Sequence, residues 1–326
     1  MGRLARRAID TETSRFRLRH EFVSNELGDP EEESSLFWLA LKLGWLNQVG
    51  LAAESDEEEV YAFYHPTFEE YFAALAVENW HEFLDHVPNN PALGVYRIFA
   101  PQWKEVILLW LGREDVAREK KEEFIQALVE FDDGCGEFSV IDKVRRGFYE
   151  FRAYFLAAAG IDEWKNSVSA DAIVAEIVKW GFGEFKVEQN EWVQFLYPIL
   201  EGGITALSQT NRIKAIAALV ELIGNPQLDD DIRREAVSSL GEIGSGNQEA
   251  IDALVELIGK PQLDDFTRWQ AVFSLGKIGS GNQKAINALV ELIGNPLVKT
   301  RFIASPKRLV NLSRPIFPQS RECDRP

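Results

Sequence analysis

Hydrophobic residues recur with helical spacing through the last third of the chain, in three nearly identical segments. The sequence AIAALVELIG at residues 215–224 returns as AIDALVELIG at 250–259 and as AINALVELIG at 285–294, a period of 35 residues. Apolar positions three and four apart share one face of a helix. A repeat of this length indicates stacked helical units, each burying its apolar face against its neighbours. We therefore expect a solenoid that holds partners on its surface.

Each repeat is predicted to be a pair of helices. In the second repeat, the first helix covers residues 231–243 and ends at Gly244, and the second starts after Asn247 and ends at Gly259. Asp or Asn before a helix and Gly behind it are the expected capping residues. A helical hairpin of this length resembles the HEAT-like repeat, particularly the short variety of bilin lyases and many cyanobacterial proteins. The resemblance covers residues 205–296.

Comparison of the first helices of two successive repeats separates constant from variable positions. The constant residues are Ala236, Val237, Leu240 and Ile243, which return as Ala271, Val272, Leu275 and Ile278. Their spacing places them on one helix face. We expect this face to be core.

The variable positions of these helices lie on the opposite face. Aromatic residues replace Asp231, Arg234 and Ser238 there. Aromatics on a solvated helix face are candidate anchors for a protein partner. The alternative is that they pack against the following repeat or under the C-terminal tail. The candidate partner-binding residues are Phe266, Trp269, Phe273, Arg234 and Lys277.

The first 200 residues follow a different pattern. The apolar run at residues 35–43 predicts a helix, and the alternating bulky residues at 60–64 predict a short strand. An acidic loop separates them, as at the end of a small winged-helix unit. From Pro66 to residue 200 the periodicity is helical almost throughout. We expect an all-α fold of four parts: a winged-helix remnant (1–64), a helical linker domain (65–204), HEAT-like repeats (205–296) and a divergent basic tail (297–326).

Composition disfavours several functions. A net charge of -17 repels nucleic-acid phosphates, and the two cysteines, Cys135 and Cys323, are too few for a disulfide framework. No P-loop sequence, apolar membrane span or secretory signal is present. His81 and His86 are five residues apart, which turns them about 140° from each other on a helix and disfavours a zinc site. We expect a cytoplasmic, non-catalytic protein that holds no cofactor or metal.

One segment points to a signalling family. Residues 63–74, FYHPTFEEYFAA, resemble the run that follows the winged helix in NACHT-type NTPases of the STAND class, with Glu69 in place of the family's usual Gln. Residues 15–20, 43–50 and 101–112 resemble cyanobacterial members of this group that end in HEAT-like repeats.

This resemblance implies that the chain is a detached arm of such a protein. In the family, an NTPase core binds nucleotide, and C-terminal repeats sense a trigger and hold the core closed. The core is missing here, so the implied partner is a protein or an NTPase core in trans. The resemblance also implies that His65 contacts nucleotide phosphates, and only together with an external core. The alternative is a bilin lyase or phycobilisome-associated protein, which the short repeats alone would fit.

Overall fold

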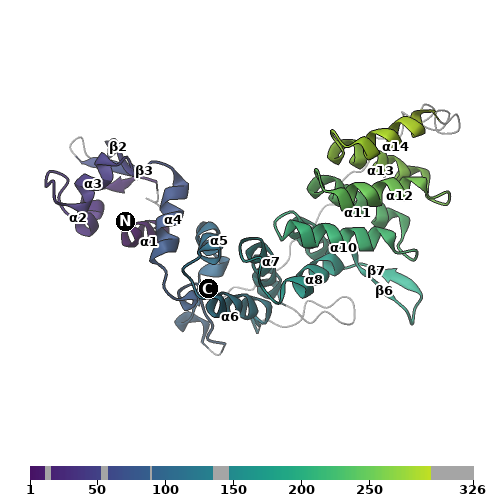
Figure 1. The fold of residues 1–326 in the computed structure, drawn as a ribbon. Coiled ribbons are helices and arrows are strands. Elements are labelled where there is room, and N and C mark those ends of the chain that lie inside the picture. Colours follow the sequence, from purple (N-terminus) through teal and green to yellow (C-terminus); the bar gives the residue numbers. More distant parts are fainter. Residues whose placement is uncertain (12–15, 53–57, 89, 135–146, 295–326) are drawn as a thin grey trace. The chain divides into compact units, whose positions relative to one another are not determined.

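The structure is a computed structural model that describes residues 1–11, 16–52, 58–88, 90–134 and 147–294. Its contacts form two compact units, residues 1–170 and the residues from 171 onward (Figure 1). Most of the described residues are helical, and they also form three small antiparallel sheets. The fold is therefore mostly helical rather than all-α. The predicted tail, residues 297–326, lies outside the described part.

The first 64 residues combine helices with a three-stranded sheet in the order β1-β3-β2. The predicted helix is α3, where the Ser35 hydroxyl accepts the Trp38 N–H at 3.0 Å. The predicted strand is β3, which buries Val60 and Tyr61. Strand β2 has no alternating apolar pattern and was not predicted from the sequence. The elements are α1 (Gly2–Asp10), β1 (Leu18–Arg19), α2 (His20–Leu27), α3 (Leu36–Lys42), β2 (Leu46–Leu51) and β3 (Glu59–Phe63).

The rest of the first unit surrounds an aromatic core. Trp103, Trp110 and Phe124 are fully or almost fully buried around Phe83, with ring centroids 5.7 to 6.0 Å from it. Short strands and 3-10 turns interrupt the region that the periodicity predicted to be helical almost throughout. The elements are α4 (Pro66–Ala76), η1 (Trp80–Glu82), β4 (Leu84–Asp85), η2 (Pro91–Leu93), β5 (Val95–Tyr96), η3 (Arg97–Phe99), η4 (Pro101–Trp103), α5 (Lys104–Gly112), α6 (Arg118–Val129) and α7 (Phe148–Glu163).

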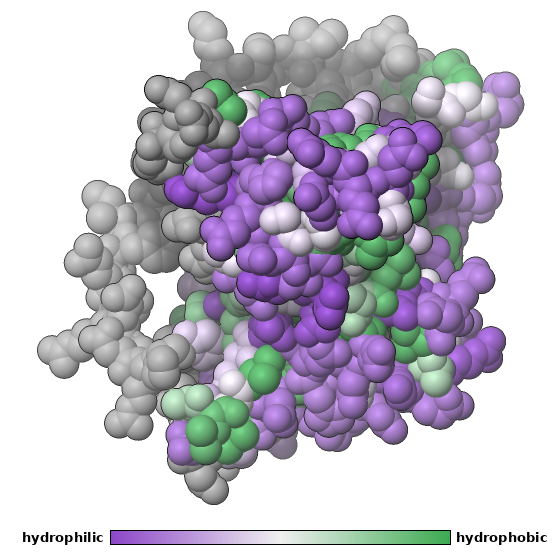
Figure 2. Space-filling view, turned by 90° about the vertical axis from the view of Figure 1, so that its left-hand side faces the viewer, coloured by the Kyte–Doolittle hydropathy of each residue, from purple (hydrophilic) through white to green (hydrophobic). Residues whose placement is uncertain are grey.

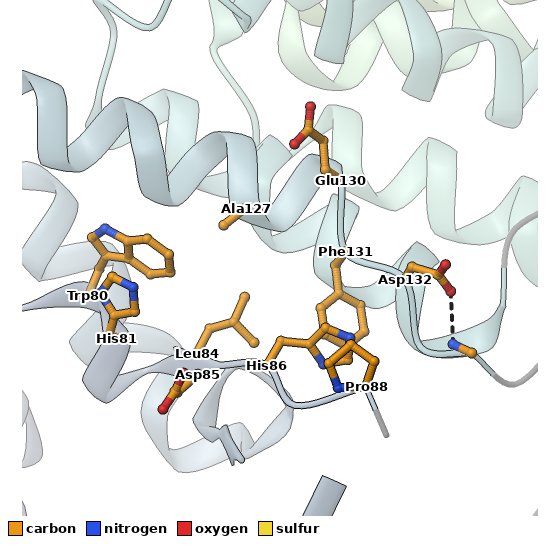
Figure 3. A pocket seen from close by; sticks show the side chains of 11 residues that line it. Trp80, His81, Leu84, Asp85, His86, Pro88, Ala127, Glu130, Phe131 and Asp132 are labelled. Atoms are coloured by element: carbon orange, nitrogen blue, oxygen red, sulfur yellow. Dashed lines mark hydrogen bonds between the residues drawn. The ribbon is translucent and has the colours of Figure 1, made fainter. Parts of the chain in front are cut away.

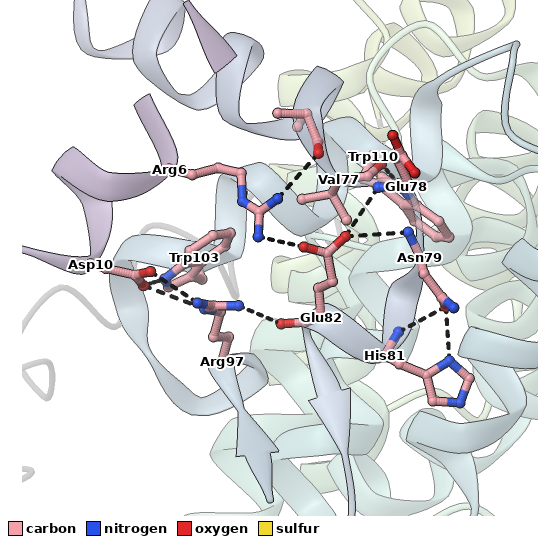
Figure 4. Close-up of polar contacts among 12 residues, drawn as sticks. Arg6, Asp10, Val77, Glu78, Asn79, His81, Glu82, Arg97, Trp103 and Trp110 are labelled. Atoms are coloured by element: carbon pink, nitrogen blue, oxygen red, sulfur yellow. Dashed lines mark hydrogen bonds and ion pairs between the residues drawn. The ribbon is translucent and has the colours of Figure 1, made fainter. Parts of the chain in front are cut away.

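A polar network ties α1 to this aromatic core (Figure 4). Arg97 forms an ion pair with Asp10 at 2.9 Å and donates to the Glu82 carbonyl at 2.8 Å. The Trp103 indole N–H donates to Asp10 at 3.1 Å, and Arg6 forms an ion pair with Glu82. Because α1 lies more than seventy residues before Glu82, Arg97 and Trp103 in sequence, residues on both sides of position 64 belong to one packed body.

The second unit consists of a helix, a hairpin and a stack of helix pairs. In Figure 1, α10 to α14 follow one another as successive layers. The elements are α8 (Ala170–Phe182), β6 (Glu184–Lys186), β7 (Glu191–Val193), α9 (Tyr197–Leu207), α10 (Arg212–Gly224), α11 (Asp230–Ile243), α12 (Gln248–Gly259), α13 (Asp265–Ile278) and α14 (Gln283–Gly294). The bounds of α11 and α12 agree with the two helices predicted from the capping pattern. None of the described helices has both the length and the apolar composition needed to cross a membrane.

Candidate functional site

The aromatic residues predicted to bind a partner lie on α13, whose start is set by Asp264. One oxygen of this carboxylate accepts the backbone N–H of Phe266 at 2.9 Å and of Thr267 at 3.0 Å. Burial alone would raise the pKa of Asp264, but these hydrogen bonds and the nearby Arg234 outweigh it and leave the pKa below its usual value. The cap therefore stays ionised at neutral pH and complements the helix dipole.

One face of α13 is exposed and aromatic. Phe266 is 74% exposed, Trp269 is 44% exposed and Phe273 is 59% exposed. The rings of Trp269 and Phe273 stack, with centroids 5.7 Å apart and planes 12° apart. We call Phe266, Trp269 and Phe273 the aromatic face. It provides a preformed apolar surface, because two of its rings already hold each other in place.

The opposite face of α13 packs against α11. The Ser274 hydroxyl donates to the Val237 carbonyl at 3.0 Å, and the Thr267 hydroxyl donates to the Asp230 carbonyl at 3.2 Å. A Cβ atom placed on Gly241 would lie 2.4 Å from the Ser274 oxygen, so a glycine is needed for this close approach. Small residues thus bring the two helices together.

The constant positions are core in most cases, as predicted. Ala236, Val237 and Leu240 are fully buried, and Ala271, Leu275 and Ile278 are buried as well. The prediction is wrong for two residues, because Val272 and Ile243 are only half-buried. Val272 is equivalent to Val237, which α13 covers; no described helix of a further repeat covers α13 in the same way.

The two predicted basic residues occupy different helices. Arg234 lies on α11, where it pairs with Asp231 at 2.5 Å and is close enough to lower the pKa of Asp264. Lys277 is exposed in the last turn of α13. The structure therefore places positive charge near both ends of the aromatic face.

Sequence reasoning missed a pair of arginines that join consecutive helices. Arg233 is buried and donates to the carbonyls of Ile223 at 2.6 Å and Leu228 at 2.8 Å. Its equivalent in the next repeat, Arg268, donates to the carbonyls of Ile258, Lys260 and Leu263. The recurrence of arginine at the same repeat position could have identified this pair. It was not used, because arginine is usually exposed and was not expected to be buried.

His65 has a structural role at the start of α4. Its Nδ1 atom accepts the Thr67 backbone N–H at 3.2 Å and lies 2.9 Å from the Thr67 hydroxyl. The residue is exposed. Because Nδ1 accepts the capping hydrogen bond, only Nε2 could contact a phosphate group. The phosphate contact of His65 stays a prediction.

The first unit also carries exposed hydrophobic side chains. Those on or next to α3 and α4, each at least 37% exposed, are Leu36, Leu39, Leu43, Tyr64, Phe68, Tyr71 and Leu75. Two of them, Leu36 and Leu75, line a cavity of about 350 Å³ together with Met1, Leu27 and Phe72 among others. Figure 2 shows one side of the molecule, where hydrophobic areas interrupt a largely hydrophilic surface.

A cavity of about 450 Å³ opens between α6 and the segment after α4. Leu84 and Ala127 lie at its middle, with Trp80 and Phe131 on either side (Figure 3). His81 and His86 also line it, but each Nδ1 contacts a neighbour, Asn79 or Tyr96 respectively. Among the described residues, neither histidine belongs to a group of three or more side chains close enough to share a metal ion.

The carboxylates that do gather are Asp132, Asp133 and Glu150, whose oxygens lie within 4.8 Å of one another. Asp132 accepts the Gly134 N–H at 2.9 Å and Asp133 accepts the Tyr149 N–H at 3.0 Å. Two of the three carboxylates are therefore engaged in backbone hydrogen bonds.

Comparison with known proteins identifies the repeats. The family of HEAT repeats matches residues 199–266 and 216–305. No curated protein and no solved structure matches the chain. The segment from α9 to α14 therefore consists of HEAT repeats, which are protein-binding scaffolds, and the match does not extend to the first 198 residues.

Proposed function

We propose that this chain is a non-catalytic interaction module that binds a protein partner through the aromatic face of α13. The observation that carries the proposal is the exposure of three aromatic side chains on one helix of a HEAT-repeat stack. Monomeric proteins rarely leave such surfaces open, and Trp and Phe anchors contribute much of the binding energy in protein interfaces. Arg234 and Lys277 supply polar contacts at the edge of this face.

A photo-crosslinking experiment tests this proposal. A benzophenone amino acid replaces Phe273 in the full chain, and a matched variant carries it at Glu256, which is exposed on α12. Irradiation in an extract of the native host should give one discrete crosslinked protein from position 273 and none from position 256. Equal or absent crosslinking at both positions would refute the proposal.

We further propose that the partner system is STAND-type signalling, with an NTPase core that binds the first unit in trans. Three features support it: the order helix, strand, helix, helix, strand, strand in the first 64 residues, the sheet order β1-β3-β2, and the exposed apolar side chains of α3 and α4. A P-loop reading frame next to this gene supports the proposal. Flanking DNA without any NTPase would count against it.

Bilin attachment is the alternative function. HEAT repeats are compatible with it, but the repeat match begins only at residue 199 and leaves most of the chain outside the family. Mixing the protein with phycocyanobilin and an apo-phycobiliprotein distinguishes the two functions. Stereospecific chromophore attachment would replace the interaction module as our preferred function.

A further inference from the structure

The cavity between α6 and the segment after α4 has the size of a small-molecule site. Its volume of about 450 Å³ lies within the range of roughly 300 to 1,000 Å³ that ligand pockets occupy. Leu84 and Ala127 form its middle (Figure 3), and Leu84 is only 3% exposed. The middle of the cavity therefore offers apolar contacts, and the groups at its two ends decide which ligand it selects.

Aromatic rings lie at both ends of this cavity (Figure 3). At one end, the rings of Trp80 and His81 stack, with centroids 3.8 Å apart and planes 23° apart. At the other end, the ring centroids of His86 and Phe131 lie 4.8 Å apart. The face of an aromatic ring is electrostatically negative and attracts a cation that lies over it. Both ends are therefore suited to a positively charged group.

The ionisable side chains around the cavity agree with this. Apart from the two histidines, those of the described residues that line it are all carboxylates, namely Asp85, Glu130 and Asp132, and each of them is exposed. Two are held in place, because the Gln126 side-chain amide donates to Glu130 and the Gly134 N–H donates to Asp132 at 2.9 Å. A bound anion would meet three negative charges here, whereas a cation is attracted.

His81 adds a hydrogen-bond acceptor at its end of the cavity. The Asn79 side-chain oxygen accepts the His81 backbone N–H at 3.1 Å, and the same oxygen lies 2.8 Å from His81 Nδ1. Because an amide oxygen only accepts, Nδ1 is the nitrogen that carries the proton in this contact. In the neutral ring, Nε2 is then an acceptor, and an ammonium group supplies the matching N–H donors.

The order of these groups fits a cation with charges at both ends. The two aromatic ends are separated by the apolar middle at Leu84 and Ala127 (Figure 3). Carboxylates accompany this order, because Asp85 directly follows Leu84 in the chain and Asp132 directly follows Phe131. An aliphatic polyamine has the same alternation, since short methylene chains join its ammonium groups.

We propose that this cavity binds a linear aliphatic polyamine, with ammonium groups at the two aromatic ends and methylene groups across the middle. The inference goes beyond the proposed function and does not depend on the aromatic face of α13, because all of its residues belong to the first unit. A short monoamine fills only one end of the cavity, and an uncharged chain is not attracted by the carboxylates. Both therefore bind more weakly than a polyamine.

Equilibrium dialysis of the full chain against labelled spermidine tests this site. The salt concentration is about 0.15 M, where the Debye length is about 8 Å and distant surface charges are largely screened. The wild type should bind one spermidine per chain, saturably, with a Kd below about 1 mM. An equal concentration of butylamine, octane-1,8-diol or Mg²⁺ should leave most of the spermidine bound.

Two variants locate the binding in the cavity. Ala127→Leu fills the middle of the cavity and should abolish binding. The double variant Asp85→Asn with Glu130→Gln should weaken binding at least about fivefold, as expected for the loss of two charge pairs. The matched control, Glu114→Gln with Glu119→Gln, removes two charges from exposed residues of the first unit that do not line the cavity. It should leave the Kd within about twofold of the wild type.

The main alternative is diffuse attraction of a polycation to a protein with a net charge of -17. The inference is overturned by a wild type without saturable binding, by equal displacement with Mg²⁺, or by a control variant that binds as weakly as the cavity double variant. Ala127→Leu that binds like the wild type, with unchanged circular dichroism, also overturns it. Because the variants lie on the first unit, failure of crosslinking from position 273 rejects the proposed function alone.

Discussion

Replacing Arg233, the buried arginine of α11, should destabilise the packing between α10 and α11. Arg233 lies on α11 and its guanidinium donates to the carbonyl of Ile223, in the last turn of α10, and to that of Leu228 in the loop between the helices. Carbonyls at a helix end have no partner within the helix. Arg233→Ala therefore leaves two largely buried acceptors without their donor.

The structure also sets the size of the effect. A hydrogen bond to a charged group contributes about 1.5 to 3 kcal/mol, so losing both should cost about 3 kcal/mol after relaxation and partial access of water. The matched control is Arg234→Ala, one residue along the same helix, which removes an exposed ion pair with Asp231. Such pairs contribute only about 0.5 kcal/mol. Arg233→Lys should fall between the two, because one ammonium group cannot hold both carbonyls as the planar guanidinium does.

Hydrogen exchange followed by mass spectrometry measures this locally. It is preferred to global unfolding because the chain has two units that need not unfold together. Each 1.4 kcal/mol corresponds to a tenfold change, so amides of α10 and α11 should exchange about 100-fold faster in Arg233→Ala than in the wild type. Exchange within about threefold of that in Arg234→Ala would show that the arginine contacts do not hold the helices together.

Three further changes test the packing and the helix caps. Gly241→Ala should destabilise the α11–α13 contact by about 1 kcal/mol, because its methyl group would meet Ser274. Gly259→Ala, at an open position, should be neutral or stabilising. Equal hydrogen exchange of the α11 and α13 amides in the two variants would contradict this reasoning. His65→Ala should destabilise the start of α4 by about 1 kcal/mol, because the hydrogen bond that caps this helix is lost, and His65→Asn should restore that stability. Hydrogen exchange of the amides in the first turn of α4 measures both effects. A His65→Asn variant that exchanges as fast as His65→Ala would indicate that His65 has another role. Asp264→Asn keeps a capping oxygen but removes a carboxylate whose pKa is lowered in the folded state. The wild type should therefore lose its stability advantage over this variant as the pH falls below about 3.8. A difference in stability that does not change with pH would refute the reasoning.

Local patterns were enough to predict the helices of the repeats. The bounds of α11 and α12 follow from Asp, Asn and Gly caps and from apolar spacing, which act within a few residues of the chain. Phe266, Trp269 and Phe273, which repetition marked as variable, are exposed side chains of α13. Their role in binding a partner stays a prediction.

Not every strand of the first unit could be predicted from local sequence patterns. Strand β2 runs from Leu46 to Leu51, and only its first residue is buried, so no alternation of apolar residues revealed it. It exists because β3 pairs with it, Leu46 opposite Phe63. A strand without a strong pattern of its own depends on the strand with which it pairs.

The sequence also did not show which of the constant repeat positions are exposed. Ile251 and Ile286 occupy the same repeat position, yet the first is buried and the second is 43% exposed. Arg233 is likewise buried although its residue type predicts a surface position. Residue type and spacing specify which helix forms and which side of it is apolar, since these depend on near neighbours in the chain. Burial depends on which other helix packs on that side, so it became visible only when the helices were placed in space.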